Sequence, residues 1–274
     1  MACKERHLEV ALLGGFGNQL FQLANAVSLS LKFSRIFSFK SPHVGRPTAI
    51  DQIGLIPGKY YRAIVAGGVL EVRETESKCQ AILRENYVEK SFTHSPIALK
   101  NSCGRIKGYF QSYKYFESHD ISFRNWLVDK LALEVGSNQE NLIGLHARFG
   151  DMANDRNFRD YHGVISEDYV FSALAYFDSP VNNLRIVSEN RLDLEREMPN
   201  ILQLKPQIIS GNSAIEDFRV LTQFERLIIS NSTFSWWAAW CSQGSVIAPK
   251  NWFAPKVLIA NPINDLIPPT WVLL

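Results

Sequence analysis

The sequence predicts an α/β protein built from two halves, and three observations carry this prediction. A short apolar run, residues 10–13, leads into a glycine-rich turn and then into an amphipathic helical stretch. A second apolar run, residues 142–145, ends in the polar residues 146–151 and opens a further alternation of apolar runs and helical stretches. Of the 274 residues, 46% are hydrophobic and 20% are charged, as in globular proteins that bury a core of this kind.

The first half begins with an expected strand at residues 10–13 and an expected helix at residues 20–31. They are joined by Gly14-Gly15-Phe16-Gly17-Asn18-Gln19. We expect Asn18 to cap the helix, because an asparagine oxygen accepts the unsatisfied N–H groups of a first helical turn. Glycines let a ligand approach the backbone, and N–H groups at a helix start attract anions. The loop is thus a candidate ligand-binding turn, and an ordinary strand-to-helix turn explains it equally well.

The remainder of the first half carries weaker signals. Residues 40–60 are rich in proline and glycine and are expected to form loops and turns. Residues 60–103 show no clear pattern. The run Gly108-Tyr109-Phe110-Gln111-Ser112 is a small aromatic and polar cluster, and it precedes an expected helix at residues 116–133.

A break at Gly136-Ser137-Asn138 divides the chain, so we expect an N-terminal half of residues 1–136 and a C-terminal half of residues 137–274. The expected strands of the C-terminal half are residues 142–145, 184–187, 227–229 and 245–248. Its expected helices are residues 166–177, 190–197 and 213–224, and a further helix that begins after Ser232. Within residues 213–224 the apolar side chains share one face, and we expect Glu216, Asp217 and Arg219 on the exposed side.

The segment LHARFGD, residues 145–151, places three functional side chains at the end of an expected buried strand. In open α/β sheets, ligands bind beyond the carboxyl ends of the strands. The guanidinium of Arg148 suits phosphate oxygens, and His146 lies two residues away on the same strand face. Asp151 can orient either side chain by hydrogen bonding. The alternative is a structural ion pair between Arg148 and Asp151.

Two further expected strands also end in polar residues. Residues 184–187 are followed by Ser188-Glu189-Asn190. The Glu189 carboxylate could accept hydrogen bonds from a base or a ribose, and a plain helix N-cap is the alternative. Residues 227–229 are followed by the run Ser230-Asn231-Ser232-Thr233-Phe234-Ser235. Small polar residues at a helix start form a nest for phosphate. Of the adjacent Trp236 and Trp237, we expect at least one to pack in the core.

Composition and charge argue against several classes of protein. The net charge of +2, with scattered Lys and Arg, gives no indication of nucleic-acid binding. The 4 cysteines form no Cys-x-x-Cys pair, which argues against a zinc site and fits free thiols in a reducing compartment. The sequence shows no signal-peptide core and no integral membrane segment. We expect a cytoplasmic protein, with a peripheral membrane location or a soluble fragment of an anchored enzyme as open alternatives.

Four blocks of the sequence together resemble the α-1,2-fucosyltransferase family. They are GGFGNQLFQLANA, HARFGD, Ser188-Glu189-Asn190 and ISNSTFSWWAAW, and they follow one another in the family's order. The resemblance implies a GT-B-like fold, in which two Rossmann-like halves face each other across a cleft. It also implies an inverting enzyme that uses GDP-fucose, with the donor held mostly by the C-terminal half and the acceptor on the N-terminal side.

Carried over position by position, the resemblance implies roles for individual residues. Arg148 would bind the diphosphate, His146 would lie near the nucleotide, and Asp151 completes this catalytic block. The residues implied to bind the donor are Gly15, Gly17, Asn18, Gln19, Ser188, Glu189, Asn231, Ser232, Thr233, Phe234 and Ser235. Two positions depart from the family pattern. Phe149 stands where the family has a second arginine, and Glu189-Asn190 stand where it has two aspartates.

We therefore expect a glycosyltransferase that moves fucose from GDP-fucose to a hydroxyl of a galactose-containing glycan, in α-1,2 linkage. We expect no cofactor and no metal, because the chain has no Asp-x-Asp motif and the family resemblance implies none. The expected partners are a GDP-sugar donor and a glycan acceptor; the oligomeric state and the catalytic base are left open. The alternatives are a transferase for another GDP-sugar or fucosyl linkage, and a non-catalytic nucleotide- or glycan-binding module. A Rossmann dehydrogenase is excluded, because no acidic residue follows the first glycine loop at about 20 residues in a strand-end position.

Overall fold

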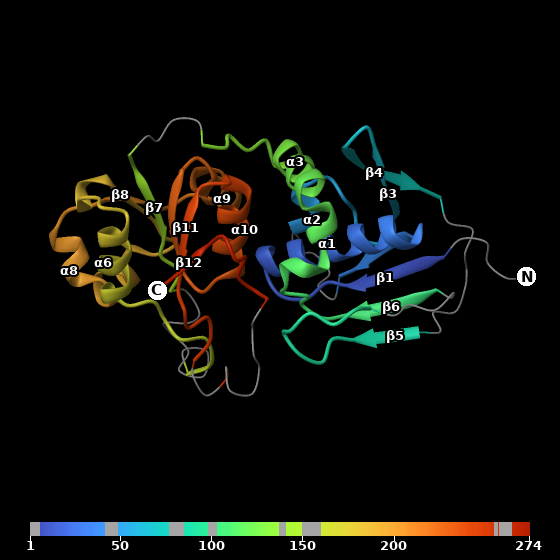
Figure 1. The fold of residues 1–274 in the computed structure, drawn as a ribbon, viewed down its shortest axis with the longest axis horizontal. Helices are drawn as coiled ribbons and strands as arrows, with labels where there is room; N and C mark the ends of the chain where they lie inside the picture. The colour runs from blue at the N-terminus through green and yellow to red at the C-terminus, as the bar shows by residue number, and fades with distance from the viewer. Residues whose placement is uncertain are drawn as a thin grey trace, which may run out of the picture. The chain divides into compact units, whose positions relative to one another are not determined.

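The computed structural model describes residues 6–41, 49–76, 85–97, 103–136, 141–149, 160–254, 257 and 265–274. The chain forms two compact α/β units, each with its own sheet (Figure 1). Unit 1 comprises Met1–Leu131 and Pro262–Ile267, and unit 2 comprises Ala132–Asn261 and Pro268–Leu274. A short segment near the C-terminus therefore belongs to unit 1.

Unit 1 contains a mixed sheet with the strand order β4-β3-β2-β1-β6-β5. Its strands are β1 (His7–Ala11), β2 (Ile36–Lys40), β3 (Tyr60–Ala66), β4 (Val69–Thr75), β5 (Glu85–Val88) and β6 (Gly104–Lys107). β2, β1, β6 and β5 run parallel, and β3 and β4 add an antiparallel hairpin at one edge. The sequence analysis located neither this hairpin nor β2, β5 and β6. Unit 1 is therefore Rossmann-like only in its parallel part.

The helices of unit 1 correct one prediction. They are α1 (Phe16–Phe33), α2 (Ala49–Gln52), the 3-10 helices η1 (Tyr113–Tyr115) and η2 (Glu117–His119), and α3 (Asp120–Leu131). Because Gly14 has a φ of 69°, the chain turns sharply after β1 and α1 begins at once, with Gly15 as its N-cap. The prediction that Asn18 caps this helix was wrong. Asn18 lies inside the first turn, and its oxygen accepts a hydrogen bond from Gln111 instead.

Unit 2 contains a fully parallel sheet with the strand order β12-β11-β10-β7-β8-β9. Its strands are β7 (Ile143–His146), β8 (Leu184–Val187), β9 (Gln207–Ile209), β10 (Arg226–Ile229), β11 (Ser245–Ala248) and β12 (Val272–Leu273). The chain runs outward from β7 through β8 to β9, and then returns to the other side of β7 to form β10, β11 and β12. This is the 3-2-1-4-5-6 order of nucleotide-binding α/β sheets, whose direction switches between β7 and β10.

Among the described residues of unit 2, four helices lie close to their predicted positions, and two short ones, at residues 181–183 and 199–203, were not predicted. They are α6 (Glu167–Tyr176), η3 (Val181–Asn183), α7 (Arg191–Glu197), α8 (Pro199–Gln203), α9 (Ala214–Thr222) and α10 (Thr233–Ser242). One expected orientation was wrong: the Asp217 side chain is not on the exposed side of α9 but is 4% exposed. Asp217 precedes the buried Leu221 by four residues, and residues at this spacing share a helix face.

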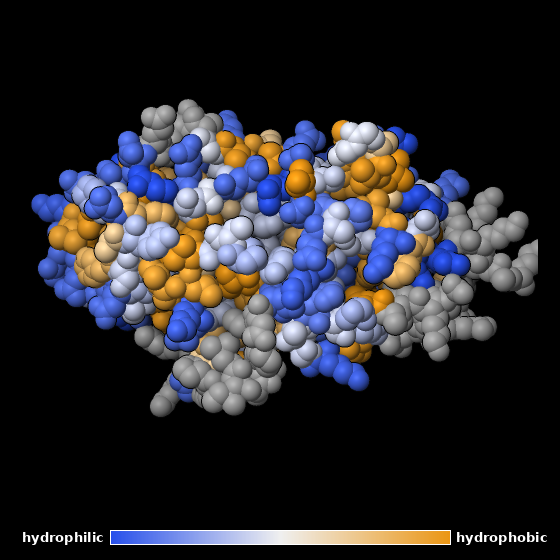
Figure 2. Space-filling model, in the orientation of Figure 1, coloured by the Kyte–Doolittle hydropathy of each residue, from blue (hydrophilic) through white to orange (hydrophobic). Residues whose placement is uncertain are grey.

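The cores of the two units follow from the apolar runs that define their central strands. In unit 2, Ile143, Leu145, Ile186 and Ile228 are all 0% exposed. Trp236 and Trp237 are both fully buried, which confirms that α10 supplies aromatic packing to the core. Figure 2 shows hydrophilic and hydrophobic residues interspersed on the visible face of each unit. No helix among the described residues has the length and apolar character needed to cross a membrane.

Candidate functional site

The two longest polar blocks of the C-terminal half flank the strand-order switch of unit 2. β7 and β10 are paired in parallel, with His146 opposite Ile229 in the register. The segments that follow them, Ala147–Arg148 and Ser230–Ser235, therefore leave the sheet side by side at its carboxyl edge. In open α/β sheets this crevice is where ligands bind. The order of the strands thus brings together two blocks that are far apart in the sequence.

His146 is a buried, uncharged member of this site. It is 1% exposed, its Nδ1 shares a hydrogen bond of 2.5 Å with the Ser235 hydroxyl, and its ring packs against Phe234. Burial, and secondarily the positive charge of Arg148, lowers the pKa of His146 to about 3. The imidazole is therefore neutral near pH 7. It connects β7 to α10 by a hydrogen bond and supplies no positive charge to a phosphate.

Arg148 lies at the edge of the sheet with its charge accessible. Its Nη1 donates a hydrogen bond to Glu189 Oε1 at 2.6 Å, and the side chains of Arg148 and Glu189 are 28% and 48% exposed. Glu189 follows β8, the neighbour of β7 in the sheet, so the pair joins two adjacent strand ends. An exposed ion pair of this kind contributes little to stability, about 0–1 kcal/mol. The carboxylate can therefore be exchanged for another anion at small cost.

Phe149, which follows Arg148, points into the core. It is 2% exposed and packs in the hydrophobic cluster of unit 2. The position where the resemblance implies a second arginine is therefore occupied here by a core side chain, and Arg148 is the cation among the described residues that follow β7. Asp151 lies outside the described residues.

The hydroxyl-rich loop after β10 uses most of its side chains internally. Asn231 Nδ2 donates to the carbonyl oxygens of His162 at 2.6 Å and Trp252 at 3.2 Å. The Ser232 hydroxyl accepts from the N–H of Phe234 and caps α10, and the hydroxyls of Ser230 and Ser235 are 3.0 Å apart. Thr233 is half-buried. The groups that this loop can offer an anion are therefore the backbone N–H groups at the start of α10 and the Thr233 hydroxyl.

Ser188 also forms bonds within the strand-end loop. Its N–H donates to the Ile209 carbonyl at 3.1 Å, and its hydroxyl donates to the Asn190 carbonyl at 3.5 Å. Asn190 caps α7 by accepting from the N–H of Leu192. The N-cap that the sequence offered as an alternative is thus Asn190, which leaves Glu189 for Arg148.

Asp217 is a carboxylate that the sequence analysis did not place at the site. Asn212 Nδ2 donates to its Oδ1 at 3.1 Å. Burial raises the pKa of Asp217, the hydrogen bond from Asn212 opposes this, and the negative charge of Glu189 raises it further. Asp217 lies in the first turn of α9, the helix that follows β9 in the chain. The spacing of Asp217 and Leu221 along α9 was the signal that could have found it.

The glycine-rich turn of unit 1 is held by amide side chains. Gln22 accepts from the Leu13 N–H at 2.9 Å and donates to the Leu13 carbonyl at 3.0 Å. Gln19 donates to the Gly14 carbonyl at 3.0 Å. A Cβ atom at Gly14 would lie 2.3 Å from Asn18 Nδ2, so only glycine fits there. Gly15 and Gly17 complete the turn, whose shape is therefore set by its neighbours.

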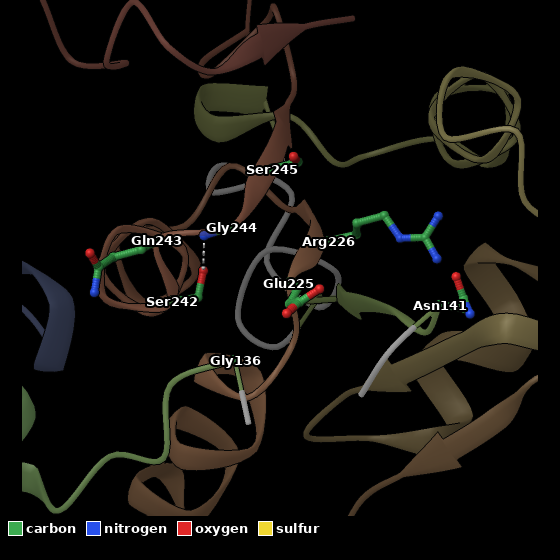
Figure 3. A pocket seen from close by; sticks show the side chains of 8 residues that line it. All are labelled: Gly136, Asn141, Glu225, Arg226, Ser242, Gln243, Gly244 and Ser245. Atoms are coloured by element: carbon green, nitrogen blue, oxygen red, sulfur yellow. Dashed lines mark hydrogen bonds between the residues drawn. The ribbon is translucent and has the colours of Figure 1, made fainter. Parts of the chain in front are cut away.

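A pocket of about 560 Å³ lies at the opposite edge of the unit 2 sheet (Figure 3). Arg226 and Ser245, which line it, are the first residues of β10 and β11, and Asn141 precedes β7. The pocket is therefore at the amino ends of the parallel strands, where none of the predicted site residues lies. The carboxyl edge remains the candidate site.

The fold and the site define a class of protein. In α/β proteins with this strand order, the edge at the switch is where ligands bind, and here it carries an accessible arginine and a helix N-terminus. The comparison with family models names the class more closely. The model for glycosyl transferase family 11 matches residues 1–274, and the chain belongs to this family. It is a glycosyltransferase.

Three curated relatives have informative names. An alpha-1,2-colitosyltransferase of Escherichia coli is 24% identical over 95% of this chain and 96% of its own length. The O-antigen biosynthesis glycosyltransferase WbnK of Escherichia coli is 23% identical over 89% of this chain and 94% of its own length. A galactoside alpha-(1,2)-fucosyltransferase 2 of Oryctolagus cuniculus is 25% identical over 68% of this chain and 57% of its own length. The solved structure of POFUT1 in complex with GDP is similar with a TM-score of 0.42 and 8% identity, over 89% of this chain and 96% of that chain.

Proposed function

We propose that this glycosyltransferase transfers fucose from GDP-fucose to a hydroxyl of a galactose-containing glycan, with inversion and in α-1,2 linkage. The observation that carries the proposal is the exchangeable pair of Arg148 and Glu189 at the switch of unit 2. The names of the relatives support the linkage, since two of them are alpha-1,2-transferases. We further propose that units 1 and 2 correspond to the acceptor-side and donor-side domains of a GT-B enzyme.

In this proposal the Arg148 guanidinium leaves Glu189 and binds the diphosphate of the donor. The bond between fucose C1 and the phosphate oxygen breaks, the acceptor oxygen forms its bond to C1 from the opposite face, and GDP and the hydroxyl proton leave. Negative charge grows on the departing diphosphate, so a fixed cation lowers the barrier most at that point. Backbone N–H groups at the start of α10 and the Thr233 hydroxyl would donate hydrogen bonds to the same charge.

The remaining residues would bind the nucleotide or hold the binding groups in place. Asp217 and the released Glu189 carboxylate are proposed to accept hydrogen bonds from the base or the ribose. Neutral His146 would keep β7 and the start of α10 in register through Ser235. Because Arg148 and N–H groups supply the positive potential, we propose that the reaction needs no divalent metal and no cofactor.

The test is a panel of GDP-sugars assayed with the purified protein against a glycan array, with product detected by mass. Fucosylated galactosides formed from GDP-fucose are the expected result. Release of GDP without any glycan product indicates a donor-binding enzyme whose acceptor is absent from the array. The proposal would be refuted if no GDP-sugar gave either GDP release or a glycan product.

A second donor is favoured by a specific observation. The relative that aligns with this chain over 96% of its own length is named a colitosyltransferase. The GDP-sugar panel therefore includes a colitosyl donor. A higher kcat/KM with that donor than with GDP-fucose would replace fucose in the proposal and leave the linkage and the site unchanged.

A further inference from the structure

Unit 1 has a strand-order switch of its own. β1 pairs in parallel with β2 on one side and with β6 on the other, and the chain runs from β1 to β2 before it returns to β6. The carboxyl ends of β1 and β6 therefore flank a crevice of the kind in which α/β proteins bind ligands. In Figure 1 the arrows of β1, β6 and β5 point the same way, so the segments that follow these strands meet at one edge. These segments are the glycine-rich turn, residue 89 and the 108–112 loop.

Two side-chain amides join the segments at this switch. Gln111, which is 7% exposed, donates from Nε2 to Asn18 Oδ1 at 2.7 Å. The remaining groups are Asn18 Nδ2, a donor, and Gln111 Oε1, an acceptor, and neither forms a hydrogen bond within the part of the chain that the structure describes. A sugar hydroxyl both donates and accepts. A donor and an acceptor held next to each other therefore match two neighbouring hydroxyls of a sugar ring.

The Glu89 carboxylate fixes the conformation of the 108–112 loop. It accepts from the N–H of Tyr109 at 2.7 Å and from the N–H of Phe110 at 3.0 Å. Phe110 has a φ of 54°, a left-handed conformation that costs a non-glycine residue free energy and persists only where neighbours enforce it. Burial raises the pKa of Glu89, and the hydrogen bonds from the N–H groups of Phe110 and Tyr109 oppose this rise.

The fixed loop buries one aromatic ring and exposes the next. Phe110 is 0% exposed and packs against Tyr87 and Tyr115. Tyr109 is 37% exposed. Tyr109 and Gln111 are two positions apart in the sequence, a backbone span of at most about 7 Å. The loop that carries Gln111 therefore also carries an accessible aromatic ring, on a backbone held by Glu89.

We propose that Tyr109, Gln111 and Asn18 form a subsite of unit 1 for a neutral hexose of the acceptor glycan, with Glu89 as its positioning residue. The apolar face of the sugar packs on the Tyr109 ring, and the amide pair binds two adjacent hydroxyls. All three contacting side chains are uncharged, which suits a neutral sugar rather than the diphosphate of the donor. The proposal rests on the proposed function, because it names where that reaction's acceptor binds.

The first test compares acceptor and donor kinetics in Tyr109→Ala and Gln111→Leu. The acceptor is the glycan with the highest product yield on the array. Each variant loses one stacking or neutral hydrogen-bond contact, so we expect the acceptor KM to rise about tenfold. The donor KM, and the slow release of GDP from GDP-fucose without acceptor, are expected to stay within about twofold of wild type. Tyr109→Phe retains the ring and is expected to retain the acceptor KM.

The control is Tyr176→Ala, which removes a tyrosine that is 58% exposed in unit 2. It is expected to leave both KM values unchanged. An acceptor KM unchanged in both Tyr109→Ala and Gln111→Leu would overturn the subsite, and so would an equal rise in the donor KM. A different result, the absence of both transfer and GDP release in the wild-type protein, would refute the proposed function itself.

Glu89→Gln tests the positioning role. The amide has one acceptor oxygen where the carboxylate has two, and its NH2 group would face the backbone N–H groups of the loop. We expect the acceptor KM to rise about tenfold with the donor KM unchanged. Glu89→Ala is expected to raise it at least as much. A Glu89→Gln protein that unfolds at the wild-type temperature and keeps the wild-type acceptor KM would remove Glu89 from the proposal.

Discussion

Replacement of Arg148 by alanine separates the role of this residue in the reaction from its role in the fold. The side chain is 28% exposed, and it lies 2.6 Å from a Glu189 carboxylate that is 48% exposed. Solvent screens such a pair, so its loss should lower the free energy of unfolding by less than about 1 kcal/mol. The melting temperature should therefore change by a few degrees at most.

The expected effect on turnover is much larger. Removal of one group that stabilises the charge of a transition state costs about 10²–10³ in rate, or about 3–4 kcal/mol. We therefore expect Arg148→Ala to lower kcat at least about 100-fold. Arg148→Lys keeps the charge without the planar fork, and an intermediate rate is expected.

The assay is steady-state release of GDP from GDP-fucose in the presence of the acceptor, combined with a melting curve for each variant. The matched control is Arg191→Ala, since Arg191 is another exposed arginine of unit 2 that pairs with a glutamate, at 3.1 Å. Near-normal kcat in Arg148→Ala would refute the reasoning. An equal loss in Arg191→Ala would show that the effect comes from surface charge in general.

Three other predictions concern the histidine, the glycine turn and the metal. Because the pKa of His146 is lowered to about 3, the unfolded chain binds a proton below pH 6.5 that the folded chain does not. The free energy of unfolding should therefore fall as the pH drops from 6.5 toward 3, by about 1.4 kcal/mol at pH 5.5. Chemical denaturation should show a smaller fall in the free energy of unfolding for His146→Gln than for the wild-type protein. Gly14→Ala should destabilise unit 1 by at least about 1 kcal/mol, because it combines a φ of 69° with a Cβ atom 2.3 Å from Asn18 Nδ2; an unchanged melting temperature would contradict this. Turnover should be the same in EDTA and in added Mg²⁺, and a loss of activity in EDTA that Mg²⁺ restores would contradict the proposal of a metal-independent reaction.

Apolar periodicity alone predicted much of the local structure. The strands β8 and β11 lie at residues 184–187 and 245–248, as their high content of apolar residues predicts for strands of a parallel sheet. The β3–β4 hairpin was missed although its Gly67-Gly68 turn is a recognised hairpin signal. β4 is the edge strand of the sheet, and β3 and β4 are only partly buried, so their apolar pattern is weak.

The sequence by itself determined four buried strands of unit 2, β7, β8, β10 and β11, and the polar blocks that follow three of them, including Arg148 after β7 and the hydroxyl-rich run after β10. The tertiary structure alone decided which of these blocks meet. Asn18 binds Gln111 across 93 residues of sequence, His146 binds Ser235 across 89, and Arg148 binds Glu189 across 41, because β7 and β8 are adjacent in the sheet. The physical reason is that an apolar run encodes the burial of a strand, whereas the choice of neighbouring strand depends on packing over the whole sheet.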